Sequence, residues 1–332
     1  MINMIEKEIL NTIKKYNLIN QNEKIICGVS GGPDSICMLD ILRKISKEGK
    51  INFEIIVCHI NHLIREEAIE DEEYVVNYCK KNNIKFYVKR IDIKKYANNN
   101  KQGLEEAGRI ARYNFFEEVL KKENANKIAI AHNKNDKIET IIMKVIRGAG
   151  TAGLKGIEPK RKNKYIRPLI EIERAEIEDY CEKNNLEPRI DKTNFENDCT
   201  RNKIRNIVLP YIQKEFNPNI MQTLGRLSEI IDEEDKFLEK ITIDTYQKLK
   251  INEKEGYIVL DLKEFNKQEI VLKNRLIIYT IKKTIGNVQN IEKVNIDDII
   301  KLCNNNIGNK YLTPNKHIKV SLNKGKIFFE KV

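Results

Sequence analysis

Short apolar runs alternate with helical patterns through the first 130 residues of the chain. Four of these runs have the length and the β-branched composition of buried strands. Between them, apolar residues recur three and four positions apart, as they do along one face of a helix. This alternation predicts a parallel sheet in a doubly wound, Rossmann-like α/β domain. The predicted strands are residues 24–29, 53–60, 84–91 and 127–131, and the predicted helices between them are residues 66–81 and 104–122.

The C-terminal third has a different pattern. Pro210 and Pro218 flank the short stretch YIQKEFN and mark a domain junction. Beyond them, the apolar spacing predicts a second core built mainly from helices, and it ends in an alternating pattern that turns at residues 323–325. We therefore predict two domains, residues 1–213 with the ligand site and a smaller, mostly helical domain of residues 214–332 that ends in a β-hairpin. The predicted elements of the second domain are a long helix (220–250), a strand (257–262), two helices (269–284 and 296–304) and the hairpin (317–330).

The junction between the first strand and its helix predicts a phosphate-binding cradle. Ser30, Gly31 and Gly32 break the strand, and Pro33 suits the first turn of a helix because its missing N–H would have no partner there. Glycines let the backbone approach an anion, while backbone N–H groups and the hydroxyls of Ser30 and Ser35 are donors. The segment lacks both the GxxxxGK[ST] and the GxGxxG patterns. An ordinary strand-to-helix turn is the alternative.

A carboxylate beside phosphates requires a cation between them, so Asp34 within the cradle indicates a magnesium nucleotide. Ligands of doubly wound sheets bind beyond the carboxyl ends of the strands. Residues 59–65 and 131–140 follow two of the strands and contain three of the chain's four histidines, and we expect both segments, including His132 and Asp136, to converge on the cradle. Asp136 either caps the next helix or completes a magnesium shell with Asp34. The histidine pair at positions 59 and 62 lacks a third ligand nearby, so a metal site there is not favoured.

Two groups of basic residues allow two interpretations each. Arg109 and Arg112 lie on neighbouring turns of the predicted helix 104–122, where they either neutralise a transferring phosphoryl group or form weak surface pairs such as Glu105 with Arg109. Arg201, Lys203 and Arg205 alternate with polar residues, which suits either phosphate contacts or a solvated turn.

Composition favours a polyanionic partner. The net charge is +11 and the pI is near 9.1, although a lysine-rich proteome with solvated surfaces is the alternative. The seven cysteines form no CxxC pair, which indicates reduced thiols in a cytoplasmic protein and no zinc or iron–sulfur site. No run of about 18 apolar residues predicts a membrane span.

The motifs together resemble the tRNA(Ile)-lysidine synthetase family of the PP-loop ATP pyrophosphatase superfamily. Positions 61 and 135 carry Asn where family members often carry Asp, and longer members have an additional domain after the hairpin. The matching motifs are SGGPDS at 30–35, HxxHxxR at 59–65, ExxRxxRY at 106–113, AHxxxDxxET at 131–140, RGxGxxGLxGI from Arg147, RPL from Arg167 and DxTN at 191–194.

The resemblance implies a fold, a reaction and a set of ligands. Members use ATP and Mg²⁺ to adenylate the wobble cytidine of tRNA(Ile) with a CAU anticodon, and free L-lysine then displaces AMP to give lysidine. Family members are often dimers, so a homodimer is an expectation. The implied residues are Asp34, Arg109, Arg112, His132 and Asp136 for catalysis, residues 30–35 for ATP, and Asp34 with Asp136 for the metal.

Two other functions remain open from the sequence. A tRNA thiolase of the same superfamily would use the same adenylation, but many such enzymes carry the CxxC pairs that this chain lacks. A nonenzymatic nucleotide-binding module would use the cradle without needing His132, Asp136 and the arginines together.

Overall fold

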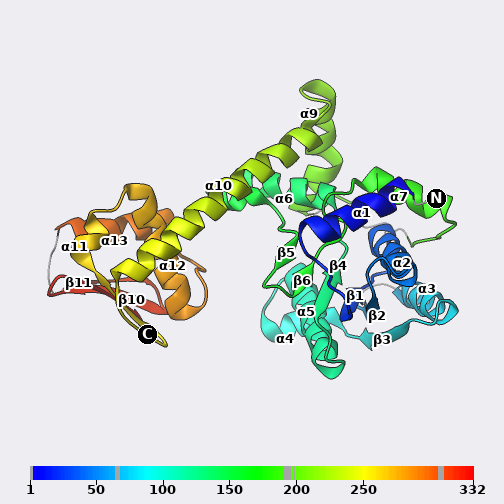
Figure 1. Ribbon diagram of the computed structural model, residues 1–332, viewed down its shortest axis with the longest axis horizontal. Coiled ribbons are helices and arrows are strands. Elements are labelled where there is room, and N and C mark those ends of the chain that lie inside the picture. Colours follow the sequence, from blue (N-terminus) through cyan, green and yellow to red (C-terminus); the bar gives the residue numbers. More distant parts are fainter. Residues whose placement is uncertain (1–2, 64–67, 190–195, 198, 306–309) are drawn as a thin grey trace. The chain divides into compact units, whose positions relative to one another are not determined.

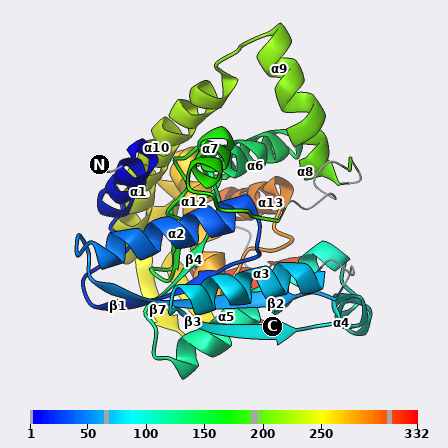
Figure 2. The same cartoon turned by 90° about the vertical axis from the view of Figure 1, so that its right-hand side faces the viewer.

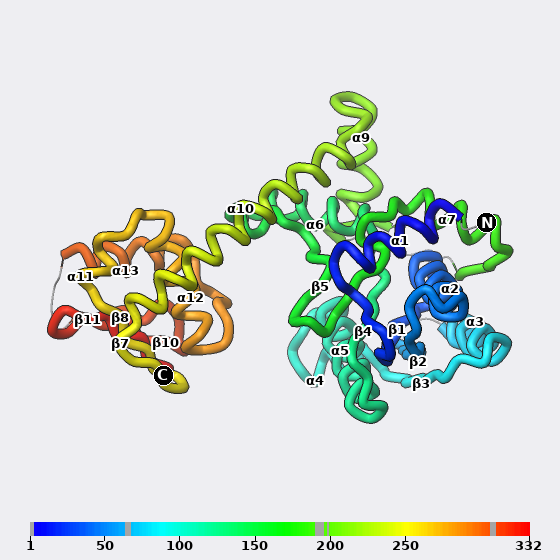
Figure 3. Tube along the Cα trace, in the orientation of Figure 1, coloured from blue at the N-terminus to red at the C-terminus, as the bar shows by residue number. Residues whose placement is uncertain are grey.

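A computed structural model describes residues 3–63, 68–189, 196–197, 199–305 and 310–332. The chain divides into two compact units, residues 1–229 and 230–332. The division falls within the helix α10 (Ile220–Leu249). Figure 1 labels the elements of both units, and Figure 3 follows the same chain as a tube coloured from the N-terminus to the C-terminus.

The first unit is built on a six-stranded sheet. The strands lie in the order β3-β2-β1-β4-β6-β5, and every neighbouring pair is parallel except β6 with β5. β2 pairs with β1 in the register Gly28 to Cys58, and β4 pairs with β1 on its other side. The strands are β1 (Glu23–Gly28), β2 (Phe53–Asn61), β3 (Lys85–Arg90), β4 (Lys127–Ile130), β5 (Lys160–Arg161) and β6 (Tyr165–Ile166).

Helices cover both faces of this sheet, as Figure 2 shows for α2 and α5. On one face the buried residues of α1, α2 and α7 form one cluster with Val57 of β2, and on the other face Phe115 and Phe116 of α5 pack against Ile26 and Ile56. Gly28 allows this close approach, because an added Cβ would lie 2.5 Å from the Phe116 ring. The helices are α1 (Met4–Lys15), α2 (Pro33–Lys47), α3 (Ala68–Lys81), α4 (Ile93–Asn100), α5 (Leu104–Lys122), α6 (Lys134–Ile146) and α7 (Arg174–Lys183).

The rest of the first unit is helical. A small cluster of buried residues joins α6 to this region, with Ile138 and Ile141 against Ile204 and Met221. Ser228 of α10 also donates a hydrogen bond to the carbonyl of Lys155 at 2.8 Å. The start of α10 therefore belongs to the first unit. The elements here are the 3₁₀-helix η1 (Thr151–Lys155), α8 (Thr200–Lys203), the π-helix η3 (Ile204–Val208) and α9 (Leu209–Glu215).

The second unit is an antiparallel sheet packed against helices. Its strand order is β7-β8-β11-β10-β9, and a single cluster of buried residues joins the sheet to α12 and α13. The closing hairpin turns between Asn323 and Lys326. The elements are β7 (Lys250–Lys254), β8 (Tyr257–Asp261), α11 (Leu262–Asn266), α12 (Ile270–Ile285), α13 (Lys293–Asn305), β9 (Tyr311–Asn315), β10 (Ile318–Asn323) and β11 (Lys326–Lys331).

The structure confirms the predicted doubly wound fold and adds elements to it. The short helix α4 and the edge strands β7 and β9 were not predicted. The second unit consequently has a five-stranded sheet where the sequence predicted one strand and one hairpin. The predicted boundary after residue 213 lies in α9, before the packing of Met221 and Ser228 onto the first unit. No helix among the described residues is long and apolar enough to cross a membrane.

Candidate active site

The candidate site lies where the strand order of the first sheet reverses. The chain leaves β1 toward β2 and β3 on one side, and β4 pairs on the other side. Loops that follow β1 and β4 therefore diverge at their carboxyl ends, the position at which doubly wound sheets bind ligands. Asp34 lies in the first turn of α2 after β1, and Asp136 lies in the first turn of α6 after β4. The two helix starts bring together residues about 100 positions apart in the sequence.

Ser35 organises the predicted cradle. Its hydroxyl accepts hydrogen bonds from the N–H groups of Ser30 at 3.1 Å and Gly31 at 3.2 Å, and it donates to the carbonyl of Gly32 at 2.9 Å. Gly31 has φ of 98°, a conformation that side chains strongly disfavour. Pro33 begins α2, as predicted. The loop is thus tightly turned by its own serine, and its binding of phosphate stays a prediction.

Asn133 links the two carboxylates. Its amide donates to Asp34 Oδ1 at 2.8 Å, and its backbone N–H donates to Asp136 Oδ2 at 3.1 Å. Burial, and then the negative charge of Asp136, raises the pKa of Asp34 to about 6, against the opposing effects of Asn133, Arg174 and Arg205. Asp136 also closes the capping box of α6. The capping role is therefore present, and it leaves Asp34 and Asp136 close enough to repel each other.

This donor set fits a magnesium ion that is shared with a nucleotide. Mg²⁺ sites of this kind use one or two carboxylates, while substrate phosphates and waters complete the shell. Among the described residues, no group of three or more His, Cys, Asp or Glu side chains is placed to hold a metal. The described residues therefore do not supply a complete set of metal ligands. They suit an ion held between Asp34, Asp136 and phosphates.

A network of arginines surrounds the start of α6. Arg205 contacts Glu139 through two bonds of 2.6 and 2.9 Å and Asp136 Oδ1 at 3.3 Å, while Arg201 lies 3.2 Å from Glu139. Glu139 is 1% exposed, and these guanidinium groups are its ion-pair partners inside the protein. The solvated-turn interpretation was wrong for Arg201 and Arg205, because both guanidinium groups face buried carboxylates of α6, whereas Lys203 is exposed.

His132 lies beside this network. Its Nδ1 is 3.1 Å from Nε of Arg167, and Arg112 of α5 and Arg201 of α8 are near enough to act on its pKa. Burial, the largest cause, and these three arginines lower the pKa of His132 in spite of the opposing charge of Asp136. Burial of its guanidinium lowers the pKa of Arg112, but an arginine starts from so high a pKa that it stays protonated.

Arg109 makes its contacts away from His132 and the two carboxylates. It forms an exposed pair with Glu106 through bonds of 2.8 and 3.1 Å, and its guanidinium lies 5.9 Å from the centre of the Tyr113 ring. Its partner is Glu106 and not the Glu105 named from the sequence. The structure therefore brings Arg112, His132, Asp136 and Asp34 together, and shows no contact of Arg109 with them.

The segment after β6 contacts the N-terminal ends of both α2 and α6. The N–H of Arg174 donates to Asn135 Oδ1 at 3.0 Å, the thiol of Cys181 lies 3.8 Å from the carbonyl of Pro33, and the N–H of Arg189 donates to the carbonyl of Gly31 at 3.0 Å. Asn135 needs only a side-chain oxygen for its contact, which Asp would also supply.

Asn61 is different from Asn135 in this respect. Its amide donates to the carbonyl of Ala68 and to Glu72, both at 3.0 Å, and Asp would lack these donors. Arg65 and the DxTN motif at 191–194 lie outside the described residues.

Sequence reasoning missed the site roles of Asn133, Glu139 and Arg174 and the contact between Arg167 and His132. Glu139, three residues after Asp136, was part of the AHxxxDxxET match, and Arg167 was part of the RPL match. The motif matches singled out Glu139 and Arg167, but only the structure shows which side chains they contact.

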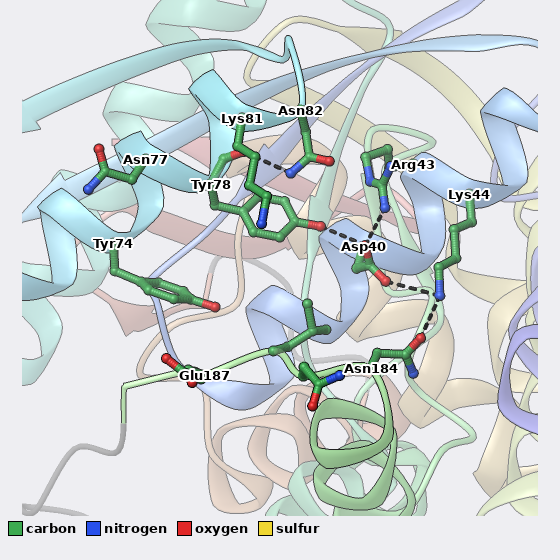
Figure 4. Close-up of a pocket in the computed structure, with 12 residues that line it drawn as sticks. Asp40, Arg43, Lys44, Tyr74, Asn77, Tyr78, Lys81, Asn82, Asn184 and Glu187 are labelled. Carbon is green, nitrogen blue, oxygen red and sulfur yellow. Dashed lines mark hydrogen bonds and ion pairs between the residues drawn. The ribbon is translucent and has the colours of Figure 1, made fainter.

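A separate pocket of about 480 Å³ lies between α2, α3 and the loop after α7. Figure 4 shows Arg43, Lys44 and Tyr78 converging on Asp40, which lines this pocket. Tyr180 also donates to Asp40 at 2.7 Å. Burial alone would raise the pKa of Asp40, but the hydrogen bonds outweigh burial and leave it below the usual value. Asp40 is a satisfied structural carboxylate, in contrast to Asp34 on the same helix.

A family model and several curated proteins match the chain. Residues 1–212 match the model of the PP-loop domain. The chain is 48% identical over 309 residues to a tRNA(Ile)-lysidine synthase of Clostridium acetobutylicum, covering 93% of this chain and 66% of that protein. It is 44% identical to a tRNA(Ile)-lysidine synthase of Clostridium tetani, covering 97% of this chain and 68% of that protein. The chain thus spans about two thirds of the length of the curated relatives it matches.

One solved structure has a similar fold. The U34-tRNA thiolase NcsA from Methanococcus maripaludis, determined with its [4Fe-4S] cluster, matches with a TM-score of 0.54 and 22% identity, over 68% of this chain and 78% of that chain. At this identity the match speaks for the fold alone.

Proposed function

Since the chain belongs to the PP-loop family and, within it, to the tRNA(Ile)-lysidine synthases, we propose that it forms lysidine on tRNA(Ile). The substrates are ATP, free L-lysine and the wobble cytidine of a CAU anticodon. The products are lysidine, AMP and pyrophosphate. The observation that carries the proposal is the facing pair Asp34 and Asp136 beside the cradle, with Arg112 and His132 next to them.

The reaction has two steps. The cytosine O2 attacks the α-phosphorus of ATP, the bond to the β-phosphate oxygen breaks, and pyrophosphate leaves. The ε-amine of lysine then attacks C2 of the adenylated base, and the C2–O bond breaks to release AMP. A loop nucleotide is readily unstacked, so O2 can be exposed at low cost.

The chain's own residues suit the first step. Asp34 and Asp136 would hold Mg²⁺, which neutralises phosphate charge when it is bound. Residues 30–35 would orient the phosphates, and the guanidinium of Arg112, which lies near His132, can stabilise negative charge that develops during the transfer. Arg109 is proposed only as a secondary contact, because its charge is already paired with Glu106.

The two units would divide the work. The first unit contains the candidate site, whereas Lys319, Lys324, Lys326 and Lys331 lie in the closing hairpin of the second unit, where they can contact phosphates of the tRNA body. Such contacts release counterions, so tRNA binding should weaken steeply with salt.

The test is nucleoside mass spectrometry of a CAU-anticodon tRNA after incubation with the protein, ATP, Mg²⁺ and lysine. Lysidine supports the proposal, thiocytidine supports a thiolase, and unchanged cytidine supports a nucleotide-binding module. Omitting lysine should leave pyrophosphate release intact and stop the product, because adenylation precedes the lysine step. The Asp34→Ala variant is the control for background modification.

A further inference from the structure

The contact between Arg167 and His132 determines where the proton of the imidazole ring lies. Nε of Arg167 is 3.1 Å from Nδ1 of His132. A guanidinium nitrogen can only donate, so Nδ1 must accept. The proton of the neutral ring therefore lies on Nε2, which has no hydrogen-bond partner in the described part of the chain.

Arg167 is held firmly in this position. It is 5% exposed, its Nη1 donates to the carbonyl of Glu158 at 2.5 Å, and its backbone N–H donates to the carbonyl of Pro159 at 2.9 Å. Within the described ranges, no carboxylate forms an ion pair with it. Arg205, in contrast, is neutralised by Glu139. Arg167 therefore presents to the ring a positive charge that no ion pair among the described residues neutralises, although the charge of Glu158 acts on it from a distance.

The groups that face His132 keep it neutral. Burial is the largest cause of its lowered pKa, and Asp136 of α6 acts in the opposite direction. The positive charges of Arg167, Arg201 of α8 and Arg112 of α5 add to the effect of burial. Three arginines oppose one carboxylate, so protonation of the second ring nitrogen is disfavoured.

We propose that Arg167 is a positioning residue that holds His132 as a neutral hydrogen-bond donor through Nε2–H and prevents it from acting as a general base. A base needs an available lone pair, but Nδ1 is occupied by Arg167 and Nε2 carries the proton. Nε2–H would donate a hydrogen bond to an oxygen that gains negative charge during adenylation, and this role rests on the proposed function. The state of the ring itself does not depend on it.

Nitrogen NMR of the full chain with ¹⁵N-labelled histidine measures that state directly. The wild-type spectrum should show one neutral tautomer for His132, protonated at Nε2, from pH 6 to 8. The His132→Gln variant identifies its signals. A ring protonated at Nδ1, or charged at pH 6, would overturn the proposal without any variant. The other histidines are His59, His62 and His317.

Three variants separate the effect of the hydrogen bond on the His132 ring from the effect of the charge. Arg167→Leu removes both, so the His132 pKa should rise toward 6.5 and both neutral tautomers should appear. Arg201→Leu removes a charge that acts on the ring but makes no hydrogen bond to it, so the Nε2–H tautomer should persist. Arg167→Lys keeps the charge and a donor, and should restore the single tautomer in part. An Arg167→Leu spectrum identical to the wild-type spectrum would refute the role of Arg167.

Kinetics provide the second measurement. Arg167→Leu should lower kcat for pyrophosphate release about tenfold and change KM for ATP less than twofold, because loss of a donor outright costs about 10²-fold or more. An equal loss in KM would indicate a structural role and contradict positioning. If wild-type protein shows the expected tautomer but makes no lysidine, the proposed function fails and the assignment of the ring stands.

Discussion

Replacing Asp34 by asparagine should stabilise the metal-free protein while it abolishes the chemistry. The pKa of Asp34 is raised from 3.8 to about 6 by burial and by Asp136. A difference of about two pKa units corresponds to about 3 kcal/mol at most. Asn cannot ionise, and its side-chain oxygen can still accept the hydrogen bond that Asn133 donates at 2.8 Å.

The sign of this stability change follows from the number of protons that the folded and unfolded chains bind. Between pH 4 and 6 the unfolded chain releases the proton of Asp34 while the folded chain retains it, so stability falls as pH rises. Above pH 6 the folded protein carries the full cost of ionised Asp34 beside Asp136. The Asp34→Asn variant avoids this cost and should exceed the wild type by up to about 3 kcal/mol at pH 7.5 and by little at pH 4.

Thermal unfolding in a chelating buffer at the two pH values measures this difference. Added Mg²⁺ should raise the unfolding temperature of the wild type and not that of the variant. Asp40→Asn is the matched control, because Asp40 is on the same helix but has a lowered pKa and paired oxygens, so its loss should destabilise. An Asp34→Asn protein that is less stable than the wild type at pH 7.5 without metal would refute the reasoning.

Three further outcomes test the site and the division of labour. Asp136→Ala should abolish pyrophosphate release, and it should lower the free energy of unfolding by about 1 kcal/mol because a capping hydrogen bond of α6 is lost. Near-normal pyrophosphate release by the folded variant would contradict the assignment of Asp136 as a magnesium ligand. Arg112→Ala should slow adenylation far more than Arg109→Ala, whose charge is already paired, and equal losses in single-turnover assays would contradict the distinction. A chain ending at Glu229 should bind Mg-ATP in a calorimetric titration yet lose most tRNA affinity, whereas full tRNA affinity would place recognition in the first unit.

The sequence alone determined the elements whose signals are local. The helix predicted at 104–122 has the observed bounds of α5, because acidic residues begin it, lysines end it and an apolar stripe runs between them. The turn at residues 30–33 between β1 and α2 was equally visible, since glycine and proline have strong local conformational preferences. α4, with the sequence IKKYANNN, was missed because its polar run has only two buried residues to mark a helical face. The edge strands β7 and β9 were missed because their side chains are mostly exposed and hydrophobic alternation is weak there.

Only the tertiary structure decided which charges meet. Arg205 lies 66 residues from Glu139 in the sequence, and no local pattern states that the two are paired. The same applies to Arg167 and His132, which are 35 residues apart and meet because β4 and β6 are neighbouring parallel strands. Arg109 and Arg112 look alike in the sequence, but they point in different directions from α5, because three residues along a helix turn a side chain by about 300°. Proximity at the edge of a sheet depends on strand order, and strand order is a property of the whole fold.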